Sequence, residues 1–140
     1  MGLEERLEEI GRSLGEREAA HVAALDAARD RAIALRQRVA VALDRFHRAA
    51  TTAGAPHLQI EIGEVRLDEK HLRAVEFDLR RGKHRAIVTA KSRGDLMLVG
   101  PFRMGKTEGP CRSFPFDAEK EVASALEDLL VRFIEEAAAP

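Results

Sequence analysis

The sequence predicts an α+β protein: a long N-terminal helix with a heptad pattern, an antiparallel meander sheet of four or five strands, and a C-terminal helix packed on the sheet. Three observations support this class. Residues 3–50 contain no proline and are rich in Ala, Leu, Glu and Arg, which form helices readily. After residue 57 apolar and polar residues alternate, as in half-buried strands. From residue 117 onward the apolar spacing is helical again.

Composition limits the class of protein further. The 140 residues are 45% hydrophobic and 34% charged, which is typical of one folded domain and excludes disordered and collagen-like chains. No apolar run approaches the roughly 20 residues that cross a bilayer, and the start of the chain is acidic where a signal peptide is basic. The only cysteine, Cys111, cannot form an internal disulfide. We therefore expect a cytoplasmic protein with no membrane contact.

The N-terminal helix carries two apolar stripes. The first comprises Leu3, Leu7, Ile10 and Leu14, and the second comprises Leu25, Ala28, Ala32, Leu35, Val39, Ala42 and Phe46. Both have the three-and-four spacing of a heptad seam. The register changes between them, near Gly11 and Gly15, so the sequence predicts either one helix with a stutter or a break there.

A helix of this length predicts self-association. At about 1.5 Å per residue it would be about 70 Å long, which exceeds the dimensions of a compact chain of this size. We therefore expect residues 1–52 to form a dimerisation segment, with the second stripe as the interface of a homodimer, and residues 57–140 to form the sheet and the last helix. Two alternatives are a helix packed on its own sheet and a helix doubled back at the glycines.

The middle of the chain predicts the sheet. Leu58, Ile60 and Ile62 alternate in one phase and Val65 and Leu67 in the other, which indicates a bulge at Gly63. Strands follow around residues 75–79, 86–91 and 96–99, separated by turns at 68–70, 81–83 and 92–95, and residues 111–116 add a short edge strand. Alternation places Glu76 and Asp78 on the solvated side of their strand.

The last helix is predicted from Asp117, a suitable N-cap residue. Its apolar face should cover one side of the sheet, because a sheet of this size needs a second layer. That face comprises Val122, Ala125, Leu126, Leu129, Leu130 and Phe133.

One formal motif occurs, at residues 100–107, where the sequence matches the phosphate-binding pattern G-x-x-x-x-G-K-[ST]. That motif needs a helix starting at the Lys-Thr pair, whereas here Glu108, Gly109 and Pro110 follow. We interpret the segment as a polar loop and keep small-ligand or nucleotide binding at residues 100–116 as a third functional alternative. The same segment contains an apolar set that could bind a partner protein or fold back on the core: Phe102, Met104, Phe114 and Phe116.

A basic stretch provides another candidate site. Although the net charge is -1, residues 53–116 are basic and residues 117–140 acidic. Lysine and arginine contacts to phosphates supply most non-specific affinity for nucleic acid, but few aromatic side chains are present to stack on bases. The candidate nucleic-acid-binding residues are Arg80, Arg81, Lys83, Arg85, Lys91 and Arg93.

No catalytic or metal-binding pattern is found. The sequence has neither H-E-x-x-H nor G-x-S-x-G, and we expect no catalytic residue, metal or cofactor. The predicted function is that of a non-enzymatic interaction or scaffold protein that self-associates through residues 3–46 and presents its sheet and the 100–116 loop to an unidentified protein partner. The alternative from another class is a nucleic-acid-binding dimer that uses the basic hairpin.

Overall fold

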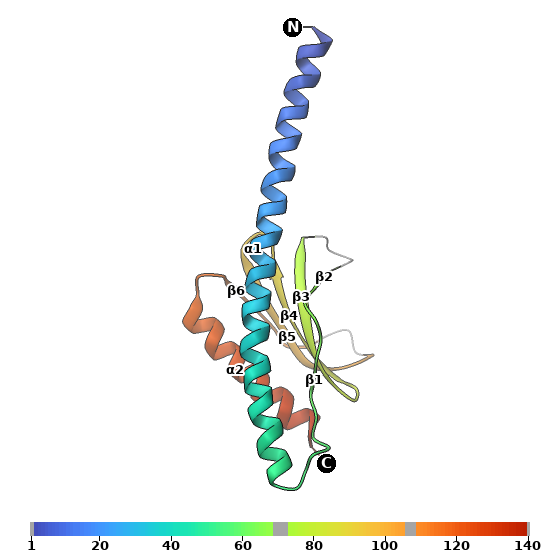
Figure 1. Ribbon diagram of the computed structural model, residues 1–140, viewed down its shortest axis with the longest axis vertical. Helices are drawn as coiled ribbons and strands as arrows, with labels where there is room; N and C mark the ends of the chain where they lie inside the picture. Colours follow the sequence, from blue (N-terminus) through green and yellow to red (C-terminus); the bar gives the residue numbers. More distant parts are fainter. Residues whose placement is uncertain (1, 69–72, 106–108, 140) are drawn as a thin grey trace.

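The computed structural model describes residues 2–68, 73–105 and 109–139. It confirms the predicted α+β architecture of a long N-terminal helix, an antiparallel sheet and a C-terminal helix (Figure 1). The elements in chain order are α1 (Leu3–Thr52), β1 (Glu61–Ile62), β2 (Arg66–Leu67), β3 (Ala74–Arg81), β4 (His84–Lys91), β5 (Asp95–Arg103), β6 (Cys111–Pro115) and α2 (Glu119–Ala137).

Helix α1 is unbroken over 50 residues, so the register changes within a continuous helix rather than at a break. Its two apolar stripes lie on the same side. Leu14 and Leu25 are separated by about three turns of 3.6 residues, and the three-and-four spacing on either side of them keeps to the same face. The apolar side of the helix therefore extends from Leu3 to Phe46, interrupted by Arg17 and His21.

The sheet has the order β1-β3-β4-β5-β6, with β2 also paired to β3, and every pairing is antiparallel. This confirms the meander and the edge strand at residues 111–115. Ile62 of β1 pairs with Leu79 and Arg66 of β2 pairs with Glu76. Between these two pairs the β1–β2 segment therefore contains one residue more than β3. That extra residue is the bulge predicted at Gly63.

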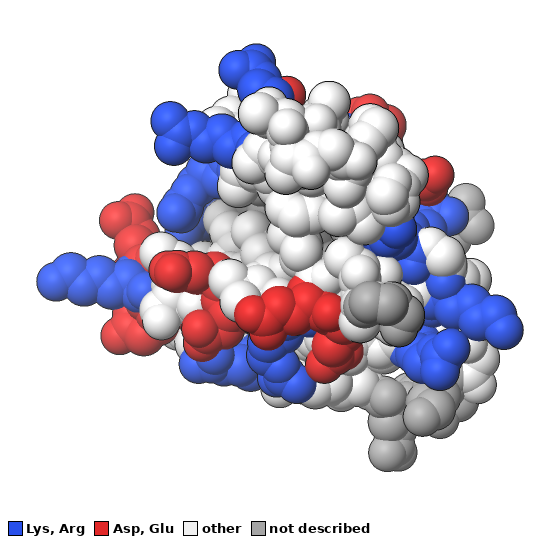
Figure 2. Space-filling model, turned by 90° about the horizontal axis from the view of Figure 1, so that it is seen from below, with Lys and Arg blue, Asp and Glu red and all other residues white. Residues whose placement is uncertain are grey.

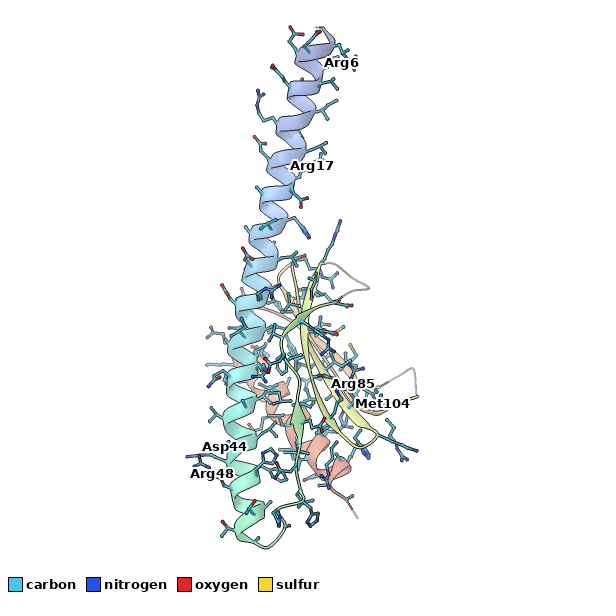
Figure 3. All side chains as sticks on the ribbon, turned by 45° about the vertical axis from the view of Figure 1, so that its right-hand side comes forward. Arg6, Arg17, Asp44, Arg48, Arg85 and Met104 are labelled. Carbon is cyan, nitrogen blue, oxygen red and sulfur yellow. The ribbon has the colours of Figure 1, made fainter. Side chains whose placement is uncertain are left out.

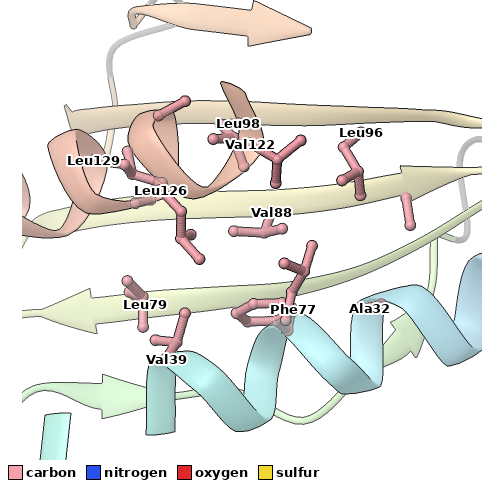
Figure 4. Packing of buried hydrophobic residues seen from close by; sticks show 14 of the residues in the cluster. Ala32, Val39, Phe77, Leu79, Val88, Leu96, Leu98, Val122, Leu126 and Leu129 are labelled. Carbon is pink, nitrogen blue, oxygen red and sulfur yellow. The ribbon is translucent and has the colours of Figure 1, made fainter. Parts of the chain in front are cut away.

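Both helices pack on one face of the sheet (Figure 1). Helix α1 lies over β3 and β4, and α2 lies over β4 and β5. Alternate strand residues point toward the two helices and pack against the apolar side of α2 (Figure 4). The strand residues of this core are Val75, Phe77, Leu79, Ala86, Val88, Ala90, Leu96 and Leu98, and those of α2 are Val122, Ala125, Leu126, Leu129 and Phe133. Asp117 does not cap α2, because the N-cap position is Ala118, which makes no side-chain cap hydrogen bond.

The second stripe of α1 packs on the chain's own sheet, which is the alternative to an interface with a second copy. Its buried members are Ala28, Ala32, Leu35 and Val39, while Leu25 and Phe46 are half-buried against the same core. Ala42 is exposed and Leu43 is buried in its place, because the helix continues at 3.6 residues per turn. These side chains are not accessible to a second chain, and the core they share with residues 57–140 extends across the predicted division at residue 52.

Candidate interaction surfaces

The first part of α1 projects beyond the sheet (Figure 1). Every residue from Leu3 to Ala20 is exposed, and the side chains of this segment, including Arg6 and Arg17, extend into open space (Figure 3). We call residues 3–20 the overhang. At about 1.5 Å per residue it is about 27 Å long. Because α1 is unbroken, the packed half of the helix holds the overhang in a defined direction.

The first apolar stripe lies on this overhang without cover from the described chain. Its members Leu3, Leu7, Ile10 and Leu14 are 52–68% exposed. The stripe lies on the side of α1 that packs on the sheet further along, so it faces the plane of the sheet beyond the sheet's end. The overhang also contains six glutamates and three arginines, of which Glu4, Arg6, Arg17 and Glu18 border the stripe and the rest lie on the far side, so it is an acidic amphipathic helix.

The sheet face opposite the helices is not covered by α1 or α2 (Figure 1). Strand residues that alternate with the core point to this side, and Arg85 and Met104 lie on the side away from α1 (Figure 3). A groove of about 540 Å³ crosses this face. It is lined by Asp68, Arg73, Ala74, Glu76, Ile87, Thr89, Lys91, Ser92, Arg93, Met97 and Val99. The floor of this uncovered face is thus partly apolar and one of its ends is rich in basic side chains.

A cluster of arginines surrounds a buried carboxylate at the other end of the uncovered face. Asp78 has 0% exposure although alternation predicted a solvated side chain. Its Oδ2 lies 2.8 Å from Arg80 Nε and 3.1 Å from Arg85 Nε, and its Oδ1 lies 3.4 Å from Arg66 Nη1. Arg66 Nη2 also pairs with Glu76 Oε1 at 3.1 Å. Three guanidinium groups therefore face two carboxylates, which leaves a positive excess.

Burial raises the pKa of Asp78, but the charges of Arg66 and Arg80 and the hydrogen bond from Arg85 outweigh it, so the pKa lies below its usual value. The carboxylate stays ionised and keeps the arginines in place. Gly63 allows this arrangement, because a Cβ there would collide with Asp78 Oδ1. Its amide donates a hydrogen bond to the Asp78 carbonyl oxygen at 2.8 Å. Sequence reasoning missed this cluster, since its arginines come from three strands.

The basic stretch does not form one continuous surface. Arg80 and Arg85 pair with Asp78, and Arg93 Nε lies 2.6 Å from Asp95 Oδ2. Arg81 instead donates hydrogen bonds to the carbonyl oxygens of His57, Gln59 and Ala137. Lys83 is exposed in the β3–β4 turn and Lys91 lines the groove. From below, acidic and basic side chains are intermingled (Figure 2).

The 100–116 segment is mostly a β-hairpin rather than a long loop. Strand β5 continues to Arg103 and β6 begins at Cys111. The Gly100 amide donates a hydrogen bond to the Pro110 carbonyl oxygen, so the start of the G-x-x-x-x-G-K-T match is paired strand. Lys106 and Thr107 of the match lie outside the described residues.

The apolar set of this segment does not form a single patch. Phe114 and Phe116 pack against the core on the helix side, which is the fold-back alternative. Phe102 pairs with Arg85 in register, on the opposite face, where it is half-buried. Met104 is 54% exposed. An interface made by all four side chains is therefore excluded by their positions on two faces of the sheet.

Within residues 2–68, 73–105 and 109–139, no group of three or more His, Cys, Asp or Glu side chains is placed to hold a metal ion. None of the helices in these ranges is both long and apolar enough to cross a membrane. Cys111 is exposed and free.

Comparison of the chain with models of protein families, with curated proteins and with solved structures finds no match. The fold and the surfaces therefore define the class directly: a two-layer α+β protein with both helices on one face of an antiparallel sheet and a projecting helical overhang.

Proposed function

We propose that this protein is a non-enzymatic interaction protein that self-associates by burying the apolar stripe of its overhang against a second copy. One observation carries the proposal. The side of α1 that is covered by the sheet from Leu25 to Phe46 continues as Leu3, Leu7, Ile10 and Leu14, where the described chain provides no cover. An amphipathic helix gains most of its stability from packing its apolar side, so an extended uncovered stripe favours an intermolecular partner.

The free energy gained by burying the stripe favours association, but a stable dimer also needs a contribution from the surface that receives the stripe. Fully burying a Leu or Ile side chain contributes about 1.5–3 kcal/mol, and these side chains are already partly shielded by their own helix. Burying the stripes of both copies therefore contributes on the order of 8 kcal/mol to the free energy of association. This is comparable to the cost of about 4–15 kcal/mol for the translational and rotational freedom that two chains lose when they associate. The other surface in the interface must contribute as well.

The proposed site of action is the cytoplasm, because the free and exposed Cys111 suits a reducing compartment.

Light scattering coupled to size exclusion tests the self-association. We expect the wild type at about 100 µM to have twice the 15.5 kDa chain mass, a concentration well above the micromolar constants of modest interfaces. Leu7→Lys with Ile10→Lys should reduce the mass to 15.5 kDa, because two charges would enter the buried seam.

The matched control is Ile33→Lys with Val41→Lys, which places the same charges on the outer side of the packed half of α1, where both side chains are about half exposed. This control should keep the wild-type mass. A wild type that remains at 15.5 kDa throughout, or a double-lysine overhang variant with the wild-type mass, would contradict the proposal.

A further inference from the structure

The uncovered sheet face and the overhang are complementary in direction, length and charge. We propose that the overhang of one copy lies on the uncovered sheet face of a second copy, and that the second copy returns the same contact, giving a two-fold dimer with exchanged helices. This inference rests on the proposed self-association and specifies which surface receives the overhang.

The direction of the stripe permits this arrangement. Because both stripes of α1 lie on one side of the helix, the exposed stripe faces toward the sheet layer and beyond its end. The uncovered face points the same way. A two-fold axis that lies in the sheet layer, just beyond the end of the sheet, and passes beneath α1 roughly at right angles to it turns the second copy over, so each stripe meets the other copy's uncovered face. The two sheets then lie end to end in one layer between the two long helices.

The lengths also agree. The overhang is about 27 Å long at 1.5 Å per residue. Strands β4 and β5 have 8 and 9 residues, so at about 3.3 Å per residue they extend over roughly 26–30 Å. A helix of this length therefore reaches from one end of the uncovered face to the other. Because the two copies are related by a two-fold axis, each supplies one overhang and one sheet face, so the assembly closes as a dimer instead of continuing into a fibre.

The chemistry of the two surfaces is matched along their length. Ile87, Met97 and Val99 provide an apolar floor in the groove for the leucine and isoleucine side chains. Among the described residues, basic side chains outnumber carboxylates by one at each end of this floor: Arg73, Lys91 and Arg93 beside Asp68 and Asp95 at one, and Arg66, Arg80 and Arg85 beside Glu76 and Asp78 at the other. Of the charged residues of the overhang, Glu4 and Arg6 border the stripe toward its start, and Arg17 and Glu18 border it toward the sheet.

The two-fold arrangement brings these charges together in the right order. Arg31 Nη2 donates to the Phe116 carbonyl oxygen and the Phe116 amide to Gly94, so the β4–β5 turn lies where α1 leaves the sheet. The partner helix enters from that end. Its Glu18, which borders the stripe, then lies near Lys91 and Arg93, and Glu4, which borders the stripe at its other end, reaches toward the arginine cluster around Asp78. Opposite charges at both ends set the position of the helix.

A seam between two overhangs is the competing arrangement, and the sequence of α1 disfavours it. The exposed stripe from Leu3 to Leu14 extends over less than two heptads, whereas a stable coiled coil usually needs three or four. The next two seam positions in that register are Arg17 and His21, which would place charged or polar side chains between the helices.

A substitution on the sheet distinguishes the two arrangements. Met97 is half-buried on the uncovered face and is not a member of the core, so Met97→Glu should leave the fold intact, as checked by circular dichroism. We expect this variant to have the mass of a single chain, because a carboxylate would be placed against the stripe and beside the glutamates. The matched control is Val131→Glu on the exposed side of α2, which should remain dimeric.

The outcomes separate the two proposals. A Met97→Glu variant that stays dimeric, while Leu7→Lys with Ile10→Lys is monomeric, overturns the sheet as the acceptor but leaves self-association in place. A wild type that is monomeric removes both.

Disulfide trapping provides a measurement that does not depend on the stability of Met97→Glu. In a Cys111→Ser background, Ile10→Cys combined with Met97→Cys should form a covalent dimer on mild oxidation, and each single cysteine variant should remain uncrosslinked. A covalent dimer from Ile10→Cys alone would indicate paired overhangs and contradict the proposal. So would a double variant that is dimeric by light scattering but does not crosslink.

Discussion

At the scale of single residues, Asp78 has a different environment from the one its position in the strand suggests. Alternation correctly places it on the side of β3 away from the core, but its carboxylate is fully buried beneath arginine side chains. The alternation of a strand reports which side a residue faces and not what covers that side. The covering side chains come from β2, β3 and β4, and the bulge at Gly63 lets the edge strand approach.

Replacing Asp78 with Asn should lower the free energy of unfolding by about 2–3 kcal/mol at pH 7. Losing one partner of a buried ion pair costs about 3–5 kcal/mol, and the arginines here are a quarter to a half exposed, so solvent screens part of the effect. Urea denaturation provides the measurement. Asp26→Asn, at an exposed aspartate of α1, is the matched control and should change the unfolding free energy by less than about 0.5 kcal/mol.

The effect of Asp78→Asn should depend on pH in a defined direction. Folding lowers the pKa of Asp78, so its contribution to stability is complete above the unfolded value of about 4 and is lost as the pH falls through the folded value. The difference in unfolding free energy between wild type and variant should therefore be constant near neutrality and decrease below about pH 4. A difference that is the same at pH 7 and at pH 3 would contradict this assignment.

At the scale of elements, α1 shows that one apolar pattern can have two structural roles. Its spacing was compatible with one helix containing a stutter or with a break near Gly11 and Gly15, and the structure has the continuous helix, with both stripes on one side. Its spacing could not specify what covers that side, because a seam with a second helix and a contact with the chain's own sheet require similar patterns. The sheet extends only as far as the second stripe, and this leaves the first stripe exposed.

Alanine substitutions in the two halves of α1 should therefore have different effects on the unfolding of a single chain. Leu35→Ala removes a core side chain and should lower the unfolding free energy by about 2–5 kcal/mol. Ile10→Ala removes a side chain that is 52% exposed and should change it by less than about 0.5 kcal/mol. Chemical denaturation at a protein concentration below the dimerisation range measures both. Equal effects would mean that the overhang packs on its own chain.

At the scale of the whole molecule, the two exposed surfaces have complementary character although they are far apart in the sequence. The overhang is acidic and apolar, and the uncovered sheet face is apolar with basic ends. A single chain cannot bring them together, because the unbroken α1 directs the overhang away from the sheet. The proposed dimer joins them between two copies.

Salt should weaken this dimer, because opposite charges at the rims of an interface are screened within about 10 Å at 0.1 M ionic strength. We expect the dissociation constant from sedimentation velocity to rise roughly tenfold between 50 and 500 mM NaCl. Glu4→Gln with Glu18→Gln, at the two glutamates that border the stripe, should reduce this dependence, whereas Glu135→Gln with Glu136→Gln, at exposed positions of α2, should not. A dissociation constant that does not change with salt would argue against the charge match.

Local patterns in the chain predicted the elements and their order, including the bulge at Gly63 and the edge strand at residues 111–115, because helical and strand periodicity and turn residues act over short stretches of chain. What each face contacts became clear only from the folded chain: Leu35 and Val39 pack on the sheet, Asp78 is buried among arginines, and Phe102 and Phe114 lie on opposite faces. These outcomes depend on contacts between residues far apart in the chain, and a local pattern specifies an apolar side without specifying its partner.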